Sequence, residues 1–525
     1  MKNKSNRLLL SALLGGLLFS FLFWEERLAL NLLIYSIYLI IITYLNPEVI
    51  KDTKFKIYGL AHLLAAILVV VNNSGLTLVS YYMSLMLFIG FSHNQQLRTV
   101  FMAFFTAILQ MITVPFNVIR NLSEVSIGNF NLKPVFKFVK YIFIPVVIVV
   151  IFTCLYSAAS SVFAHYAETF LTNIAKFFEN IFGFIFEDLS FGRFMHFCFG
   201  LMVTGGLILA FFDKSLQKIE LNFKEQLFRI RRNLNQKTIW YEFTSVFTGN
   251  LLTKKLALKT ELITGLISFG ALNFLLLFLN GIDIWWLWLG KGKNLAETNY
   301  SAELHDGTNA LIFSIALAMV VIIYFFRGNL NFYSKSKTLK VLTYVWMVQN
   351  IILIISVFIR DAYYIEYYGL THKRIGVLVF ALLCIIGLAT VYLKVAKQKT
   401  LFYLFKVNGN IWFALLLVFS TINWDVLIVK YNFAHESSIA VDPDYLISLS
   451  DKTLPVLDKN REKLHATSSK APNLTEKRAI APETNYQKML DQRIGYFKER
   501  YEKVSWLSWN FQDWNTAEYF GLNKK

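Results

Sequence analysis

Apolar stretches separated by short polar segments run from Leu8 to about Val429, and a polar tail follows them. A hydrocarbon core about 30 Å thick is crossed by about 20 apolar residues at a rise of about 1.5 Å each, and most of the stretches approach that length. Backbone amides in lipid must be satisfied within their own segment, so these stretches are predicted to be helices. The pattern therefore predicts an all-α, polytopic transmembrane helical bundle of about 11–12 spans, with a small helical extramembrane cap at its C-terminal end.

The predicted spans lie at residues 8–23, 28–45, 57–71, 75–91, 99–118, 141–157, 194–212, 262–279, 310–326, 341–359, 375–393 and 411–429. Gln110 and Pro115 interrupt the fifth of these, so we interpret it as re-entrant or interfacial, which leaves about eleven crossings. We divide the chain into N-terminal membrane helices (1–157), an amphipathic outer segment (158–193), a core membrane bundle (194–434) and a helical tail (435–525).

Two segments between spans are not simple loops. Residues 158–190 place Phe163, Tyr166 and Phe170 at helical spacing with charges between them, which predicts an amphipathic helix. It would lie on the outer leaflet or pack against the bundle. Loop 213–261 alternates basic and apolar residues, and we expect a basic helix at the inner surface that attracts anionic lipid.

The distribution of charge predicts the orientation in the membrane. Loops 213–261, 327–340 and 394–406 are basic, and they alternate with segment 280–308, in which acids outnumber bases. The positive-inside rule places the basic loops in the cytoplasm, so the tail is predicted to lie outside, in the periplasm of a Gram-negative cell. In the first half of the chain, the basic segments cannot all lie in the cytoplasm if every predicted span crosses the membrane and the tail lies outside.

Composition narrows the class further. The net charge of +18 would suit nucleic acid, but its excess lies in the short loops and the tail is nearly neutral, so we expect no nucleic-acid partner. Cys154, Cys198 and Cys384 lie in or beside apolar stretches, with no CxxC pair, and are read as buried small residues. No P-loop, GxSxG, HExxH or kinase signature occurs, and we expect neither a cofactor nor a metal.

One candidate cluster precedes the span at 310–326. Glu303, His305 and Asp306 lie within four residues, and such groups could bind a metal or shuttle protons. Their spacing matches no known metal motif. The competing interpretation is structural, with Asp306 or Thr308 capping the helix that follows.

A second cluster connects the spans at 341–359 and 375–393 on the predicted outer side. It contains Arg360, Asp361, Glu366 and Arg374, together with four tyrosines. Positive charges placed outside pair with acids, here Asp361 and Glu366, or with an anionic headgroup or ligand. This cluster is our first choice for a functional position in the chain, but we favour an ion-paired structural turn as its explanation.

Few ionisable groups are predicted deep within spans. They are His62 and, near the last exit, Asp425, while the amides of Gln349 and Asn350 are typical of residues that hold membrane helices together. This scarcity argues against a proton-driven pump with buried carboxylates. It leaves a flippase or a channel open.

The region around residues 337–387 carries distinctive motifs. They include Trp346, Gln349-Asn350, Arg360 and the run Tyr368-Gly-Leu-Thr-His-Lys-Arg374-Ile-Gly376. Further motifs are Tyr431-Asn432, Asp442-Pro-Asp444-Tyr445-Leu446, Leu449-Ser450-Asp451, Leu454-Pro455 and Ser505-Trp-Leu-Ser-Trp509-Asn510. Over about residues 262–520 the chain resembles a bacterial polytopic inner-membrane family known only as a domain of unknown function, of the 4173/4153 type. The resemblance implies no activity.

The tail can also be interpreted from its own residues. Asp442 or Asp444 is expected to cap a helix with an apolar face, broken at Pro455, and residues 486–504 form another helix. Trp506, Trp509, Phe511 and Trp514 are too many aromatics for a solvated terminus, so we expect residues 442–525 to dock on the outer face.

These observations favour a membrane protein without a catalytic centre that transports or supports an envelope-related molecule. The alternatives are a membrane-embedded enzyme acting on a lipid-linked substrate at the outer leaflet, using His305, Asp306, Arg360, Asp361 and Arg374, or an envelope-stress sensor signalling through loop 213–261. Expected partners are the lipid bilayer, with anionic lipid at the basic loop, and an envelope protein.

Overall fold

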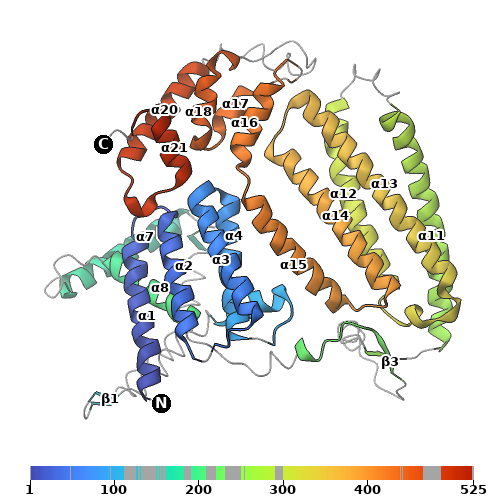
Figure 1. The fold of residues 1–525 in the computed structure, drawn as a ribbon, viewed down its shortest axis with the longest axis horizontal. Helices are drawn as coiled ribbons and strands as arrows, with labels where there is room; N and C mark the ends of the chain where they lie inside the picture. Colours follow the sequence, from blue (N-terminus) through green and yellow to red (C-terminus); the bar gives the residue numbers. More distant parts are fainter. Residues whose placement is uncertain are drawn as a thin grey trace. The chain divides into compact units, whose positions relative to one another are not determined.

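The computed structural model describes residues 2–47, 49–94, 96–110, 161–182, 191–208, 220–230, 250–252, 255–289, 300–437, 439, 441–464 and 486–522, with short pieces at 126–127, 130–131, 149, 153 and 156–157. The predicted span at 141–157, most of loop 213–261 and the end of the predicted span at 99–118 lie largely outside these residues. The fold is a helical bundle, as the sequence predicts (Figure 1).

The chain forms two compact units. The first unit contains Met1–Leu97, Met102–Gln217 and Val504–Asn510, and the second contains Arg98–Phe101, Lys218–Lys503 and Phe511–Lys525. Our division into four sequential domains stays a prediction.

The first unit is built from helices that enclose an apolar core. Its helices are α1 (Lys2–Phe23), α2 (Leu30–Leu45), α3 (Thr53–Asn72), α4 (Gly75–His93), α7 (Ser161–Phe182) and α8 (Phe191–Ile208), with the antiparallel pair β1 (Ser126–Ile127) and β2 (Phe130–Asn131). His93 and Gln110 contact the carbonyl oxygens of Leu207 and Gly206, at 2.8 and 2.9 Å, where α8 ends. These contacts satisfy carbonyls that a helix end leaves without intrahelical partners.

A short piece of the tail packs in this first unit. The main-chain N–H of Arg27 donates to Ser508 Oγ at 2.8 Å, and that of Leu30 donates to the carbonyl of Trp509 at 3.2 Å. Leu507 is 5% exposed and belongs to the core, whereas Trp506 is 63% exposed. The tail therefore docks here, but through Leu507 and Ser508 rather than through buried tryptophans.

The second unit contains the other long helices and the C-terminal cap (Figure 1). Its α-helices are α11 (Lys255–Asp283), which continues as the π-helical segment η1 (Ile284–Trp288), α12 (Tyr300–Phe325), α13 (Lys337–Tyr368), α14 (His372–Ala396), α15 (Leu401–Ser420), α16 (Trp424–Ala434), α17 (Pro443–Ser448), α18 (Leu454–Lys459), α20 (Tyr486–Glu502) and α21 (Phe511–Tyr519). Short 3-10 turns are η3 (Asn329–Phe332), η4 (Ser334–Ser336), η5 (Asp451–Thr453) and η6 (Arg461–Lys463), with η7 (Trp506–Ser508) in the first unit.

Among the described residues, six helices are long and apolar enough to cross a membrane. They are Thr53–Asn72, Gly75–His93, Leu258–Trp288, Ser334–Tyr368, His372–Ala396 and Leu401–Ser420. Shorter apolar helices match the predicted spans near residues 8–23, 28–45, 194–212 and 310–326, and Val100–Gln110 forms part of the predicted interfacial segment. The chain is therefore a multi-pass membrane protein.

The predicted last span is wrong in its bounds. The apolar run at 411–429 is divided between α15, which ends at Ser420, and α16, which begins at Trp424. Asn423 ends the first run, because its side chain accepts a hydrogen bond from the N–H of Val426 and caps α16. Asp425 consequently lies beyond the spanning helix and not inside it.

The basic helix predicted in loop 213–261 is also wrong over residues 222–230, which are not helical. Phe228–Ile230 forms strand β3, parallel to β4 (Asn250–Leu252), and Gln226 bridges to Lys399. Glu225 accepts hydrogen bonds from Lys406 and Arg98, both at 2.7 Å. These bonds and the two positive charges lower the pKa of Glu225, and their effect exceeds the upward shift caused by burial. These tertiary contacts override the alternating basic and apolar pattern from which we inferred a helix.

The cap shares one apolar core with α16 and the turn between α13 and α14. Buried residues of this core are Leu370, Ile375, Ile428, Val429, Phe433, Val441, Leu446, Leu449, Leu454, Leu457, Leu464, Leu490, Ile494, Phe497 and Ala517. Asp442 caps α17 by accepting a hydrogen bond from the N–H of Tyr445 at 3.3 Å. Pro443 occupies the first helical turn, where proline is favoured because no intrahelical partner is needed for an N–H. The cap is therefore packed against membrane helix ends and is not an independent tail.

Candidate functional site

Four elements of the second unit bring a set of polar side chains together. We call this set the turn–cap site and define it as His372, Asp425, Tyr445, Ser450 and Lys452. His372 begins α14, where Thr371 caps the helix by accepting from the N–H of Arg374. Asp425 lies in the first turn of α16, and the other three come from α17, its end and η5. A carboxylate in a first helical turn is stabilised by the helix dipole.

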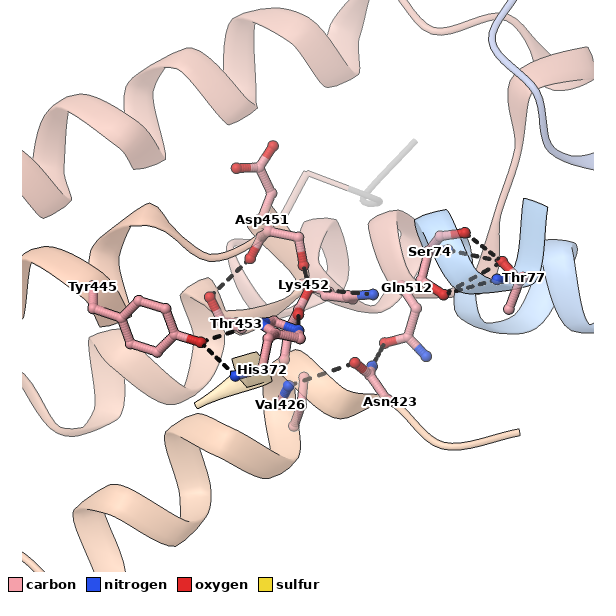
Figure 2. Close-up of polar contacts among 12 residues, drawn as sticks. Ser74, Thr77, His372, Asn423, Val426, Tyr445, Asp451, Lys452, Thr453 and Gln512 are labelled. Atoms are coloured by element: carbon pink, nitrogen blue, oxygen red, sulfur yellow. Dashed lines mark hydrogen bonds and ion pairs between the residues drawn. The ribbon is translucent and has the colours of Figure 1, made fainter. Parts of the chain in front are cut away.

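The imidazole of His372 is held from both sides. Its Nε2 lies 2.9 Å from Asp425 Oδ1, and its Nδ1 lies 3.0 Å from the phenol oxygen of Tyr445. The main-chain N–H of His372 donates to the same phenol oxygen at 3.0 Å (Figure 2). A neutral imidazole can satisfy this arrangement by accepting from Tyr445 at Nδ1 and donating from Nε2 to Asp425. Its side chain remains 50% exposed, so the site opens to the surface of the second unit.

Asp425 is the centre of the network. Ser450 donates to its Oδ2, and Lys452 Nζ lies 3.4 Å from the same oxygen, with the Lys452 side chain only 4% exposed. Burial raises the pKa of Asp425, but hydrogen bonds from His372 and Ser450 and the charge of Lys452 outweigh it and hold the pKa well below its usual value. Asp425 is therefore ionised, and it ties α16 to both α14 and η5.

The main chain of the α13–α14 turn is fixed beside this network. Gly369 has φ of +77°, a left-handed conformation that L side chains rarely adopt. A Cβ at this position would lie 2.5 Å from Asn432 Oδ1. Arg374 donates from Nη1 to the carbonyls of Tyr368, at 2.8 Å, and Gly369. The turn thus requires glycine for its conformation and for the close approach of α16.

The predicted cluster at 360–374 is only partly one site. Arg360 pairs with Asp283 of α11, a partner that the sequence pattern did not suggest. Asp361 is 5% exposed and interacts electrostatically with Arg374, whose guanidinium lies 4.3 Å from the ring centre of Tyr364. Glu366 is exposed. The expected pairing of Arg360 with Asp361 or Glu366 is wrong, because α13 turns Arg360 toward α11.

The remaining predicted residues lie elsewhere. Glu303, His305 and Asp306 fall in the first turns of α12, and their side chains lie outside the described part of the structure. Since α12 begins at Tyr300, neither Asp306 nor Thr308 is its N-cap, and that expectation is wrong. Asn350 is buried and donates to the carbonyl of Trp346 at 2.8 Å, within its own helix.

Sequence reasoning did not identify the turn–cap site as a site, although three of its five residues lie in motifs that we singled out. His372 falls in the run 368–376, and Tyr445 and Ser450 fall in the tail motifs. The contact between His372 and Tyr445 spans 73 positions of sequence. The sequence did show that several separate motifs contain polar residues that can form hydrogen bonds with one another. The sequence around each motif, however, does not indicate that these residues lie close together in the fold.

The geometry of the site suits holding elements together more than activating a nucleophile. Activation requires a nucleophile within hydrogen-bond reach of a base. Here the hydroxyl of Ser450 donates to Asp425 and not to His372, and both imidazole nitrogens have neighbours. No group of three or more His, Cys, Asp and Glu side chains within the described ranges is arranged to hold a metal ion.

One family model, described as "Domain of unknown function (DUF4153)", matches residues 58–460. The match begins within α3, well before the region in which we noted a resemblance, and it covers α4 and the helices from α7 to α18. It ends before the motif at 505–510. Neither the curated proteins nor the solved structures contain a match to this chain.

Proposed function

This chain belongs to the DUF4153 family, and we propose that it is a multi-pass protein of the bacterial cytoplasmic (inner) membrane that supports or transports an envelope-related molecule. The proposal rests on one observation. The turn–cap site joins the extramembrane cap to the ends of membrane helices α13 and α14 and to α16, through both an apolar core and an ion-pair network.

This coupling gives the cap a physical role. A protein partner that binds the cap would displace α17 and η5. The contacts of Asp425 and Asn432 would transmit this displacement to α16 and the α13–α14 turn. A packed, hydrogen-bonded connection of this kind transmits displacement, whereas a flexible tail does not. The cap is therefore proposed as the part that meets an envelope protein partner.

The orientation follows the distribution of basic residues. The α12–α13 and α14–α15 connections carry Arg327, Lys335, Lys397 and Lys399, and the α13–α14 turn lies between them in sequence. The positive-inside rule assigns these connections to the cytoplasm, with anionic lipid as their neighbour, and the α13–α14 turn and the cap to the periplasm. A phosphatase fused after Lys525 should be active in the periplasm. Activity of a cytoplasm-only reporter at that position would reverse the orientation.

An enzyme acting on a lipid-linked substrate is less well supported. The two arginines proposed for such a substrate already have protein partners, because Arg360 pairs with Asp283 and Arg374 binds the carbonyls of the turn. A substrate phosphate would have to displace these contacts. We accordingly propose a protein without its own catalytic centre.

Genetic complementation tests the proposed function. Deletion of the gene in its source bacterium should make the envelope permeable to a dye or detergent, and the wild-type gene should restore the barrier. Asp425→Asn, present in the membrane at wild-type amount, should fail to restore it. Glu366→Gln, which removes an exposed carboxylate of the same region, should succeed. An intact barrier in the deletion strain would contradict an envelope role.

A further inference from the structure

Polar side chains form a row along the interface of α11 and α13, inside the membrane-spanning lengths of both helices. We call this row the polar seam and define it as Asn273, Asn280, Asp283, Gln349 and Arg360. Gln349 Nε2 donates to Asn273 Oδ1 at 3.0 Å, Asn280 Nδ2 donates to the carbonyl of Gln349 at 3.0 Å, and Arg360 pairs with Asp283. At about 1.5 Å per residue, the α11 members extend over about 15 Å of the membrane.

The seam contains buried polar atoms whose hydrogen-bonding capacity is unused. They are Asn280 Oδ1, Gln349 Oε1, Asp283 Oδ2 and Arg360 Nε, which have no hydrogen-bond partner in the described part of the structure. Asn280 and Asp283 are 2% exposed and Gln349 is 8% exposed. Burying a polar atom without a hydrogen-bond partner is costly, so four such atoms along one interface call for an occupant.

Lipid cannot supply these partners, because acyl chains neither donate nor accept hydrogen bonds. The occupant must donate to three oxygens and accept from one N–H. Water does both, and internal water is found where a site offers each molecule two to four polar partners.

The opposite face of α11 makes the contrast clear. Phe274 and Phe278 are 76% and 67% exposed, as expected for side chains that face lipid. Between Asn273 and Asp283, the polar side chains of α11 therefore lie on the side that faces α13. Beyond Asp283 the helix becomes the π-helical segment η1, and the indole of Trp288 donates to Ser356 Oγ of α13 at 3.1 Å. Single π-helical turns in helices are often associated with functional positions.

We propose that the polar seam is a hydrated path within the membrane, along which water, and with it protons, reaches the Asp283–Arg360 pair. The path does not depend on the proposed role of the cap. It revises our expectation that buried carboxylates are scarce in the spans, since we had placed Asp283 in a loop and the structure places it, buried, at the end of α11.

Accessibility of substituted cysteines tests this proposal in lipid nanodiscs. Cys154, Cys198 and Cys384 are first replaced by alanine, and single cysteines are then introduced. Only a thiolate in contact with water reacts with a charged methanethiosulfonate reagent. Asn280→Cys should react at least about tenfold faster than Phe278→Cys on the lipid-facing side of α11, and Gln349→Cys should exceed Val348→Cys, 57% exposed on α13, by a similar factor.

Two pairs of cysteine variants, one on α11 and one on α13, are used so that the test still gives a result if one variant does not fold. Each protein is first compared with the cysteine-free parent by thermal melting, and only variants with the parental melting temperature are scored. If either seam cysteine fails to fold, the other pair decides. Seam cysteines that react no faster than their lipid-facing neighbours would show a dry interface, in which the amides only hold two helices together, and would overturn the hydrated path.

Discussion

The side-chain amide of Asn432 is hydrogen-bonded to both main-chain groups of Leu370. Its Oδ1 accepts from the N–H of Leu370 at 2.6 Å, and its Nδ2 donates to the carbonyl of the same residue at 3.0 Å. The Asn432 side chain thus gives hydrogen-bond partners to the N–H and the carbonyl of Leu370. Without it, both main-chain groups of the turn would be buried and unsatisfied. This contact, 62 positions apart in sequence, fixes the α13–α14 turn on which the turn–cap site is built.

Gly369→Ala should destabilise the protein. The new Cβ would lie 2.5 Å from Asn432 Oδ1, and alanine is strained at a φ of +77°. Together these effects should cost about 1–3 kcal/mol, read as a lower melting temperature in detergent. Gly376→Ala is the matched control, because a Cβ there meets nothing within 4 Å in a helix, so it should be neutral or slightly stabilising. Equal effects of the two substitutions would argue against this account of the turn.

Asp425→Asn should lower stability near neutral pH by about 1–3 kcal/mol, because it removes a charge that pairs with Lys452 and that accepts hydrogen bonds from His372 and Ser450. The pKa of Asp425 is lowered in the folded protein, so its contribution is present above the unfolded pKa of about 4 and is lost as pH falls toward the folded pKa. The difference between wild type and variant should therefore shrink below about pH 4. A difference that stays constant from pH 7 to pH 3 would show that charge is not responsible.

Arg360 should be coupled energetically to Asp283 and not to Asp361. Removing either member of the Arg360–Asp283 pair leaves the other buried without a partner, which costs about 3–5 kcal/mol when the pair is fully buried and less here, since Arg360 is 20% exposed. In a double-mutant cycle, Arg360→Gln combined with Asp283→Asn should cost less than the sum of the single changes. Arg360→Gln combined with Asp361→Asn should be nearly additive. The reverse pattern would restore the pairing we first expected from the sequence.

Leu507→Ala should destabilise the protein more than Trp506→Ala. Leu507 is 5% exposed in an apolar core, and truncating such a residue costs about 2–5 kcal/mol. Trp506 is 63% exposed, so its loss should change the melting temperature little. A larger effect at Trp506 would mean that the indole is covered by a surface that the described residues do not include.

The apolar pattern predicted most helices because a long apolar segment in lipid must satisfy its backbone hydrogen bonds internally, as a helix. α3, α4, α13 and α14 lie where the sequence placed spans. The pattern failed at the last span because Trp424, Ile428 and Val429 are apolar for a different reason: they pack in the cap core. The break between the two helices depends on a single cap at Asn423. Asp283 was misplaced for a related reason, since the helix continues past the apolar run through a π-helical turn.

The candidate site was predictable only in part. Arg374 and the turn around Gly369 were recognised, but their partners were not, because His372, Asp425 and Tyr445 come from three helices and meet only through the packing of the cap. Local pattern carries no information on such pairing. The partner of Arg360 was missed for the same reason.

Hydrogen–deuterium exchange in nanodiscs tests the central claim, which is that the cap and the membrane helix ends form one coupled structure. Asp425→Asn should increase deuterium uptake both in peptides of the cap, residues 442–464, and in peptides of the α13–α14 turn, residues 365–372, because Asp425 joins the two. Glu366→Gln should leave both unchanged. Uptake that rises in the cap alone, with the turn as protected as in the wild type, would contradict the coupling on which the proposed function depends.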